Sequence, residues 1–162
     1  MQGCPFDCTG CFNPGLKDFN GGKDVPLEEL IEWALSIKGI EGISISGGEP
    51  TEQLQPLNRF LTAIKEKTDM SVLLFSGRSE KEIIVLTGGK SLLNLTDVLV
   101  AGQYTIECKN SPGMWPSSAN QEIMFLTDRY DKNDFLHLPE TEIIITDEGE
   151  IVESGLGIMN VF

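Results

Sequence analysis

The sequence is poor in positive charge. It has 12 lysines and arginines against 25 aspartates and glutamates, which gives a formal net charge of −13 at pH 7. General nucleic-acid binding requires a basic surface that replaces the counterions around phosphates. The acidic balance therefore argues against a nucleic-acid partner, and its simplest interpretation is solubility.

The sequence also lacks a long hydrophobic run. No apolar stretch approaches the roughly 18–20 residues that a membrane-spanning helix needs. We expect no secretion signal, because the first cysteines begin at the fourth residue. We therefore expect a cytoplasmic protein with no membrane partner. The 162 residues contain no repeat, low-complexity tract or linker, which predicts a single domain over residues 1–162.

Histidine and cysteine are scarce. His137 is the only histidine, and its apolar neighbours favour an ordinary packed or surface side chain over a metal ligand or an acid–base group. Of the four cysteines, Cys4, Cys8 and Cys11 are clustered, whereas Cys108 lies almost a hundred residues away and is most simply a free thiol. In a reducing compartment this distribution favours a metal site over a disulfide framework.

The remaining pattern predicts alternating strands and helices. Ser79, followed by Glu82 three residues later, matches a capping box at the start of a short helix. The expected helices cover 25–37, 54–68 and 79–88, and the expected strands cover 42–50, 71–77, 96–104 and 122–127, with a terminal hairpin over 141–155. Strands that alternate with helices indicate a parallel sheet, in which sites gather at the carboxyl ends of the strands.

The three clustered cysteines offer three thiolates in one loop. A structural zinc ion requires four ligands, so it would need Cys108 or His137 from elsewhere in the chain. A redox pair of Cys8 and Cys11 would leave Cys4 unexplained. A [4Fe–4S] cluster with three protein ligands leaves one iron open to an outside ligand, where chemistry can take place. The spacing favours the cluster, with the other two readings as alternatives.

The C-x3-C-x2-C pattern resembles the signature of the radical SAM superfamily. A second resemblance is Gly47-Gly48-Glu49-Pro50, which matches a stretch that follows the second barrel strand of that superfamily. Enzymes of this kind bind S-adenosylmethionine (SAM) at the open iron and cleave it reductively to a 5′-deoxyadenosyl radical. The two motifs occur here in the superfamily's order.

Within the superfamily, the sequence resembles the activating proteins of anaerobic (class III) ribonucleotide reductase. Gly10 stands just before the third cysteine, where related enzymes carry an aromatic residue, and Asn13-Pro14 follows it. Further similar segments are Ser76-Gly77, 97–107 and 117–124. The resemblance implies a glycyl-radical enzyme as partner, most simply anaerobic ribonucleotide reductase, and flavodoxin or ferredoxin as electron donor.

The resemblance also implies a fold and a set of site residues. The expected fold is α/β, a partial (β/α)6-type barrel that is open on one side, with its first strand missing because the sequence is truncated relative to the family. Cys4, Cys8 and Cys11 would bind the cluster. The residues expected at SAM are Gly10, Phe12, Gly47, Gly48, Glu49, Pro50, Ser76 and Gly102.

Other interpretations remain open at this stage. Asp97 either orients the SAM ribose or marks the entry of a strand, and Asn120 and Gln121 are further polar candidates. The chain could be another radical SAM enzyme, namely a pyruvate formate-lyase activase or a 7-carboxy-7-deazaguanine synthase. It could also be a non-catalytic zinc-binding module, or a degenerate relative that only binds.

Overall fold

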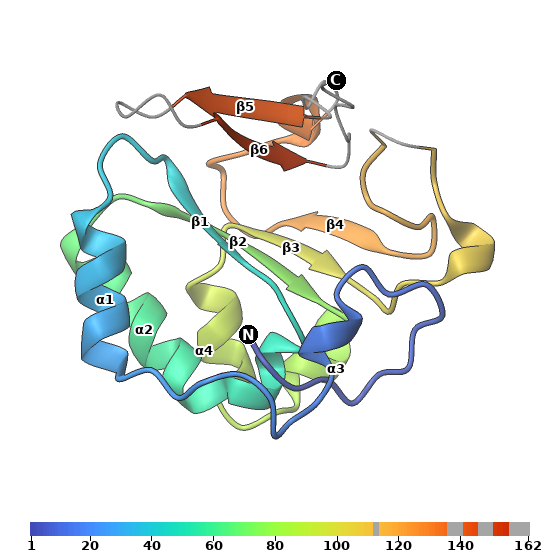
Figure 1. Cartoon of the computed structure of the whole chain (residues 1–162), viewed down its shortest axis with the longest axis horizontal. Helices are drawn as coiled ribbons and strands as arrows, with labels where there is room; N and C mark the ends of the chain where they lie inside the picture. Colours follow the sequence, from blue (N-terminus) through green and yellow to red (C-terminus); the bar gives the residue numbers. More distant parts are fainter. Residues whose placement is uncertain (112–113, 136–140, 146–150, 156–162) are drawn as a thin grey trace.

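The computed structural model describes residues 1–111, 114–135, 141–145 and 151–155. A four-stranded sheet forms its centre, with strands β1 (Gly42–Ile45), β2 (Ser71–Ser76), β3 (Val98–Ala101) and β4 (Glu122–Phe125) in that order (Figure 1). Strands β1, β2 and β3 are mutually parallel. The alternation of strands and helices in this part confirms the expected α/β class.

Strand β4 departs from an all-parallel arrangement, because it pairs antiparallel with β3, Val98 standing opposite Phe125. A parallel connection usually needs a crossover helix that returns the chain to the starting end of the sheet. In the described part of the segment between β3 and β4, the helical element is the short 3-10 helix η3 (Ile106–Cys108), and the chain re-enters the sheet from the end where β3 finishes.

The helices largely follow the sequence pattern. Helix α1 (Leu27–Ser36), helix α2 (Leu54–Lys67) and helix α3 (Glu80–Ile84) lie within or close to the expected ranges, and Ser79 and Glu82 form the expected capping box. Helix α4 (Gly89–Asn94) was not expected from the sequence. Short 3-10 helices are η1 (Pro14–Leu16), η2 (Pro50–Gln53) and η4 (Lys132–Phe135).

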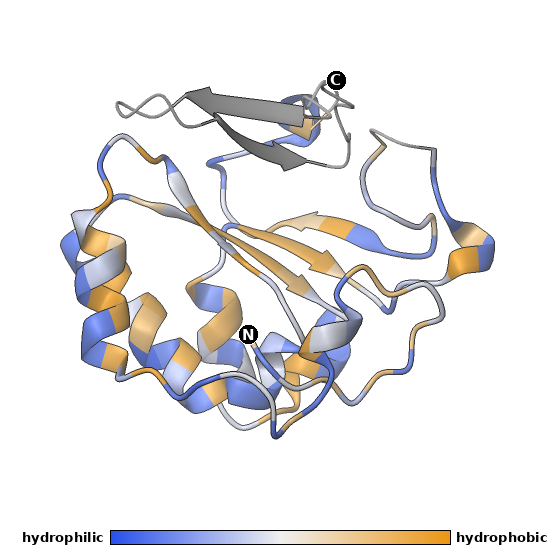
Figure 2. Ribbon diagram, in the orientation of Figure 1, coloured by the Kyte–Doolittle hydropathy of each residue, from blue (hydrophilic) through white to orange (hydrophobic). Residues whose placement is uncertain are grey.

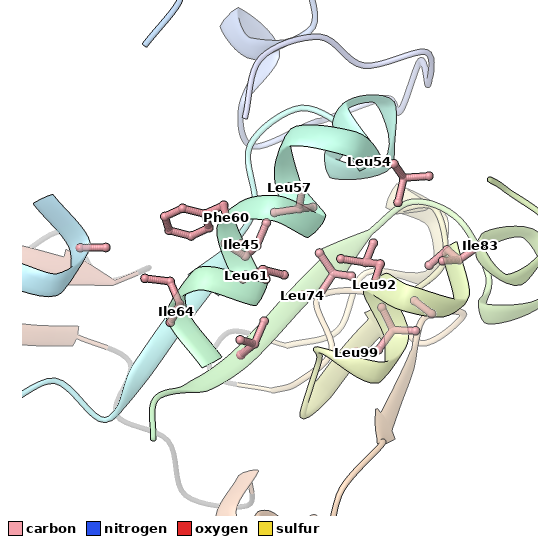
Figure 3. Packing of buried hydrophobic residues seen from close by; sticks show 13 residues of the cluster. Ile45, Leu54, Leu57, Phe60, Leu61, Ile64, Leu74, Ile83, Leu92 and Leu99 are labelled. Carbon is pink, nitrogen blue, oxygen red and sulfur yellow. The ribbon is translucent and has the colours of Figure 1, made fainter. Parts of the chain in front are cut away.

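The core lies between the helices and one face of the sheet. Helix α2 turns five apolar side chains inward at helical spacing, which are Leu54, Leu57, Phe60, Leu61 and Ile64 (Figure 3). They pack with buried residues of β1, β2, β3 and α4. Strand β3 is buried along its whole length, as expected for a strand with neighbours on both sides, and the central strands are accordingly hydrophobic (Figure 2).

Aromatic side chains form a second contact layer. Trp115 packs against Phe75 of β2 with ring centroids 5.4 Å apart, and against Phe135 of η4 at 6.0 Å. Phe135 also contacts Phe125 of β4 at 5.5 Å. The loop that carries Trp115 is therefore held to the sheet by aromatic contacts, each of which contributes about 0.5–1.5 kcal/mol beyond area burial.

Strands β5 (Thr141–Ile145) and β6 (Ile151–Gly155) form a separate antiparallel pair, which confirms the expected hairpin. The residues between these two strands, 146–150, and the single histidine, His137, lie outside the described residues. Among the helices of the described part, none is long and apolar enough to cross a membrane.

Candidate functional site

The amino-terminal segment is fixed beside the end of β1. The Gly48 N–H donates to the Met1 carbonyl at 2.9 Å, and the Glu49 N–H donates to the Gly3 carbonyl at 2.8 Å. On its other side the segment is bonded to η1, because the Gly3 N–H donates to the carbonyl of Leu16 at 2.9 Å. These bonds bring the cysteine loop to the carboxyl ends of the parallel strands, where the blue segment of Figure 1 lies.

The glycines of the Gly-Gly-Glu-Pro segment make this approach possible. A Cβ on Gly48 would stand 2.2 Å from the Gly3 carbonyl oxygen, and a Cβ on Gly47 would stand 2.3 Å from that of Met1. Gly47 also has a φ of +124°, which L side chains rarely adopt. In the structure these glycines therefore admit another stretch of the chain's own backbone.

A cavity of about 290 Å³ opens between the cysteine loop and the strand ends. Its size is at the lower end of the range for small-molecule sites, roughly 300–1,000 Å³. Nine of the eleven residues expected at the cluster and SAM line it, namely Cys4, Cys8, Cys11, Phe12, Gly47, Gly48, Glu49, Ser76 and Gly102. The structure therefore brings together side chains that come from the amino-terminal loop and from the ends of β1, β2 and β3.

Two expected residues do not line the cavity. Gly10 is exposed, has a φ of +74°, and a Cβ there would stand 2.9 Å from Ile106 Cδ1. Pro50 is buried at the start of η2. Asp97 stands at the opposite end of β3 from the cavity, where it accepts a hydrogen bond from the Val72 N–H at 2.7 Å, so the strand-entry interpretation holds for it.

Other lining residues were not among the expected cofactor contacts. They are Phe6, Asn13, Ser46, Phe75, Gly77, Tyr104, Ser117 and Gln121. Asn13, Gly77, Tyr104, Ser117 and Gln121 lie in segments that carried the family resemblance, which is a signal that points to them, and Gln121 was also a polar candidate. Phe6 and Phe75 carry no such signal, because an aromatic residue in a loop or strand is usually a packing residue.

Glu49 is the most buried charged group at the site, with 1% of its surface exposed. Its Oε1 accepts hydrogen bonds from the Thr51 N–H at 3.0 Å, the Thr51 hydroxyl at 2.6 Å and the Ser76 hydroxyl at 2.8 Å. Its Oε2 accepts one from the Gly77 N–H at 2.7 Å. This carboxylate ties η2 to the end of β2, and the four bonds compensate its loss of hydration.

The cysteine loop has a distinct electrostatic setting. All four cysteines of the chain are free thiols. Burial raises the pKa of the Cys4 thiol above its ordinary value, and the nearby Glu49 carboxylate and the other two thiols of the loop raise it further. Lys17 forms an ion pair with Asp7 of the same loop, and the hydrogen bond from Lys17 lowers the pKa of Asp7.

Three thiols of one loop line the cavity, which is the number of protein ligands that a [4Fe–4S] cluster with one open iron uses. Within the described residues, no group of three or more His, Cys, Asp and Glu side chains is close enough to hold one metal ion. Cys108 is exposed and does not line the cavity, so it adds no fourth ligand there.

Comparison with known proteins decides the family. Residues 1–124 match the 4Fe-4S single cluster domain family. The chain belongs to this family. It is also 30% identical, over 142 residues, to the anaerobic ribonucleoside-triphosphate reductase-activating protein of Escherichia coli (strain K12), covering 78% of this chain and 85% of that protein.

Two further relatives support the same assignment. The protein of the same name from Pasteurella multocida (strain Pm70) is 27% identical over 136 residues, which cover 78% of this chain and 85% of the relative. The pyruvate formate-lyase-activating enzyme of Clostridium pasteurianum is 35% identical over 72 residues, 41% of this chain and 30% of that enzyme. The chain is a radical SAM activase, and a [4Fe–4S] cluster and SAM are its cofactors.

Proposed function

We propose that this chain activates an anaerobic ribonucleoside-triphosphate reductase by generating a glycyl radical on it. The observation that carries the proposal is that Cys4, Cys8 and Cys11 line the same cavity as Glu49 and the ends of β2 and β3. Similarity to activating proteins of that name over 78% of the chain supports this partner.

The chain's residues divide into two groups within this proposal. Cys4, Cys8 and Cys11 would hold the cluster through three of its irons. The wall that Gly47, Gly48, Ser76 and Gly102 form would receive SAM, with Phe12 on the side of the cysteine loop. Gly10 and Pro50 act indirectly, since Gly10 leaves room for Ile106 and Pro50 begins the turn that follows Glu49.

When bound, the cluster and SAM supply a one-electron cleavage of SAM that ends in hydrogen-atom abstraction from a backbone glycine of the partner. The protein binds and orients both cofactors and shields them from water. Such an abstraction needs no acid–base side chain of the activase, which agrees with the scarcity of histidine. A flavodoxin or ferredoxin delivers the electron.

The sheet would form part of an open (β/α)6-type barrel, within one domain over residues 1–162. Strands β1, β2 and β3, parallel and joined through helices, support this geometry. An open side suits a protein substrate, because a loop of the partner must reach the cavity. A cluster held by three clustered thiolates needs those thiols reduced, which supports the cytoplasm as the place where the chain works.

Anaerobic reconstitution with iron and sulfide tests the proposal. The loaded protein is reduced with dithionite in the presence of SAM, and 5′-deoxyadenosine is assayed. Cys8→Ala should lose both the cluster and the nucleoside, whereas Cys108→Ala should retain both, because Cys108 lies outside the cavity. Zinc binding without iron would contradict the proposal.

The partner is tested separately, by electron paramagnetic resonance. Incubation of the loaded activase with anaerobic ribonucleoside-triphosphate reductase should produce a glycyl-radical signal on the reductase. The chain could form the nucleoside without this signal and instead produce a glycyl-radical signal on pyruvate formate-lyase. This result would support the radical SAM chemistry but overturn the assigned partner.

A further inference from the structure

Phe6 lies between the first two cysteines and is the only residue of that three-residue stretch that lines the cavity. Its ring is half-buried and lies directly against the backbone at the end of β2. A Cβ on Gly77 would stand 2.6 Å from two carbons of the ring. One side of the ring therefore lies against backbone, and a side chain at position 77 would displace the ring.

Arg78 provides a second support for the same ring. Its guanidinium carbon lies 5.5 Å from the centroid of the Phe6 ring, which is cation–π distance. The guanidinium is itself held on the protein side, because its Nε donates to the Thr51 hydroxyl at 2.9 Å and it forms an ion pair with Glu52. A planar group held at two points has little freedom to leave the ring.

The backbone of Arg78 is also fixed. Its N–H donates to the Ser76 hydroxyl at 3.0 Å, and its carbonyl accepts from the Gly102 N–H at 3.2 Å. The Thr51 hydroxyl that accepts from Arg78 in turn donates to Glu49 Oε1 at 2.6 Å. Arg78 is thus bonded to η2 through Thr51 and Glu52 and to the ends of β2 and β3, while its side chain contacts the cysteine loop.

We propose that Arg78 is a positioning residue that holds the Cys4–Cys8 segment at the cavity by clamping Phe6 against Gly77. This inference rests on the proposed function, because the clamped segment carries two of the three thiols assigned to the cluster. A site of this kind requires ligands held within about half an ångström, which depends on the groups that support them. Arg78 is not one of the residues that line the cavity, so it supplies that support from behind Phe6.

The test uses Arg78→Gln and Arg78→Lys, with Arg59→Gln as a matched control. Arg59 forms only a long ion pair of 3.6 Å with Glu28, and both of these side chains are largely exposed. The first readout is the rate at which a chelator bleaches the reconstituted cluster. The second is the rate of Cys8 alkylation in the metal-free full chain, followed by mass spectrometry, which does not depend on SAM cleavage.

We expect Arg78→Gln to speed both processes about threefold to tenfold, the range that a cation–π contact and one hydrogen bond support. Arg78→Lys keeps the charge but loses the planar stack, so it should lie between Arg78→Gln and the wild type. Arg59→Gln should match the wild type. Phe6→Leu should also speed both processes, and adding Arg78→Gln to it should change little further, because the two residues act through one contact.

Two results would overturn the inference. One is an unchanged Cys8 alkylation rate in both Arg78 variants. The other is equal acceleration at Cys8 and at the distant Cys108 together with a lowered melting temperature, since this would show general destabilisation. If the wild-type chain binds iron but does not cleave SAM, the proposed function fails, yet the alkylation result still decides the role of Arg78.

Discussion

The Gly77 N–H donates to Glu49 Oε2 over 2.7 Å and so joins the ends of two neighbouring parallel strands. Glu49 follows β1 and Gly77 follows β2, and the same carboxylate accepts from the Ser76 hydroxyl at 2.8 Å. A buried carboxylate thus sets the spacing of the strand ends that form one wall of the cavity. The cysteine loop is bonded to the same segment through Gly3.

Glu49→Gln should destabilise the chain. An amide has only one acceptor oxygen, so at least one of the four donors around Glu49 would face an NH2 group instead of an acceptor. An unsatisfied buried polar group costs about 1–3 kcal/mol. Urea unfolding of the cluster-free chain measures this loss, with the exposed Glu66 of α2 as the control in Glu66→Gln. Equal stability of the two variants would contradict the assigned role of Glu49.

Gly48→Ala should displace the amino-terminal segment. The new Cβ would stand 2.2 Å from the Gly3 carbonyl oxygen, and backbone cannot move away as easily as a flexible side chain. We expect a stability loss of about 1–3 kcal/mol and a lower iron content after reconstitution. Gly15→Ala is the control, because no heavy atom lies within 4 Å of a Cβ there. Normal iron binding by Gly48→Ala would show that the segment does not need this contact.

Because of Asp97, the free energy of unfolding should decrease as the pH becomes acidic. Burial raises the pKa of Asp97, but hydrogen bonds from Lys65, the Val72 N–H and Thr127 lower it by more, so the net pKa lies below its ordinary value. A carboxyl group with a lowered pKa stabilises the folded chain fully above the pKa that it has in the unfolded chain, near 3.9. This stabilisation is lost as the pH falls through the pKa that the group has in the folded chain.

The comparison of Asp97→Asn with the wild type measures this contribution. Asp97→Asn should cost about 1–3 kcal/mol at neutral pH, since it removes the Lys65 ion pair and replaces an acceptor by a donor. The difference between variant and wild type should shrink as the pH falls below about 4. Urea unfolding of both cluster-free proteins across this pH range tests the prediction. A stability difference that is the same at every pH would contradict the role of the Asp97 carboxylate.

Trp115 should report occupation of the cavity. It packs against Phe75, which lines the cavity, with ring centroids 5.4 Å apart. The other tryptophan, Trp33, lies on α1 and is 61% exposed. In a Trp33→Phe background, titration of the reconstituted protein with SAM should therefore change the tryptophan emission saturably. A Trp115→Phe protein, which keeps Trp33, should show no change in tryptophan emission in the same titration. An emission change in this protein but not in the Trp33→Phe protein would place SAM elsewhere.

The class of protein and most of its helices and strands can be predicted from local features of the sequence. The spacing of Cys4, Cys8 and Cys11 and the Gly47–Pro50 segment indicated the chemistry, because thiolate number and spacing are fixed by covalent order. The amphipathic pattern of α2 and the capping box at Ser79 are local signals, and the structure shows both. Helix α4 was missed because Gly89 at its start weakens the helical pattern.

Tertiary structure alone decided how the distant segments meet. Strand β4 runs antiparallel because of the path of the chain after β3, which no local periodicity encodes. Likewise, Glu49 meets Ser76 and Gly77, and Phe6 meets Arg78, across more than twenty residues of sequence. Such contacts depend on which strand ends lie side by side and on the space that each glycine leaves, and both are properties of the packed fold.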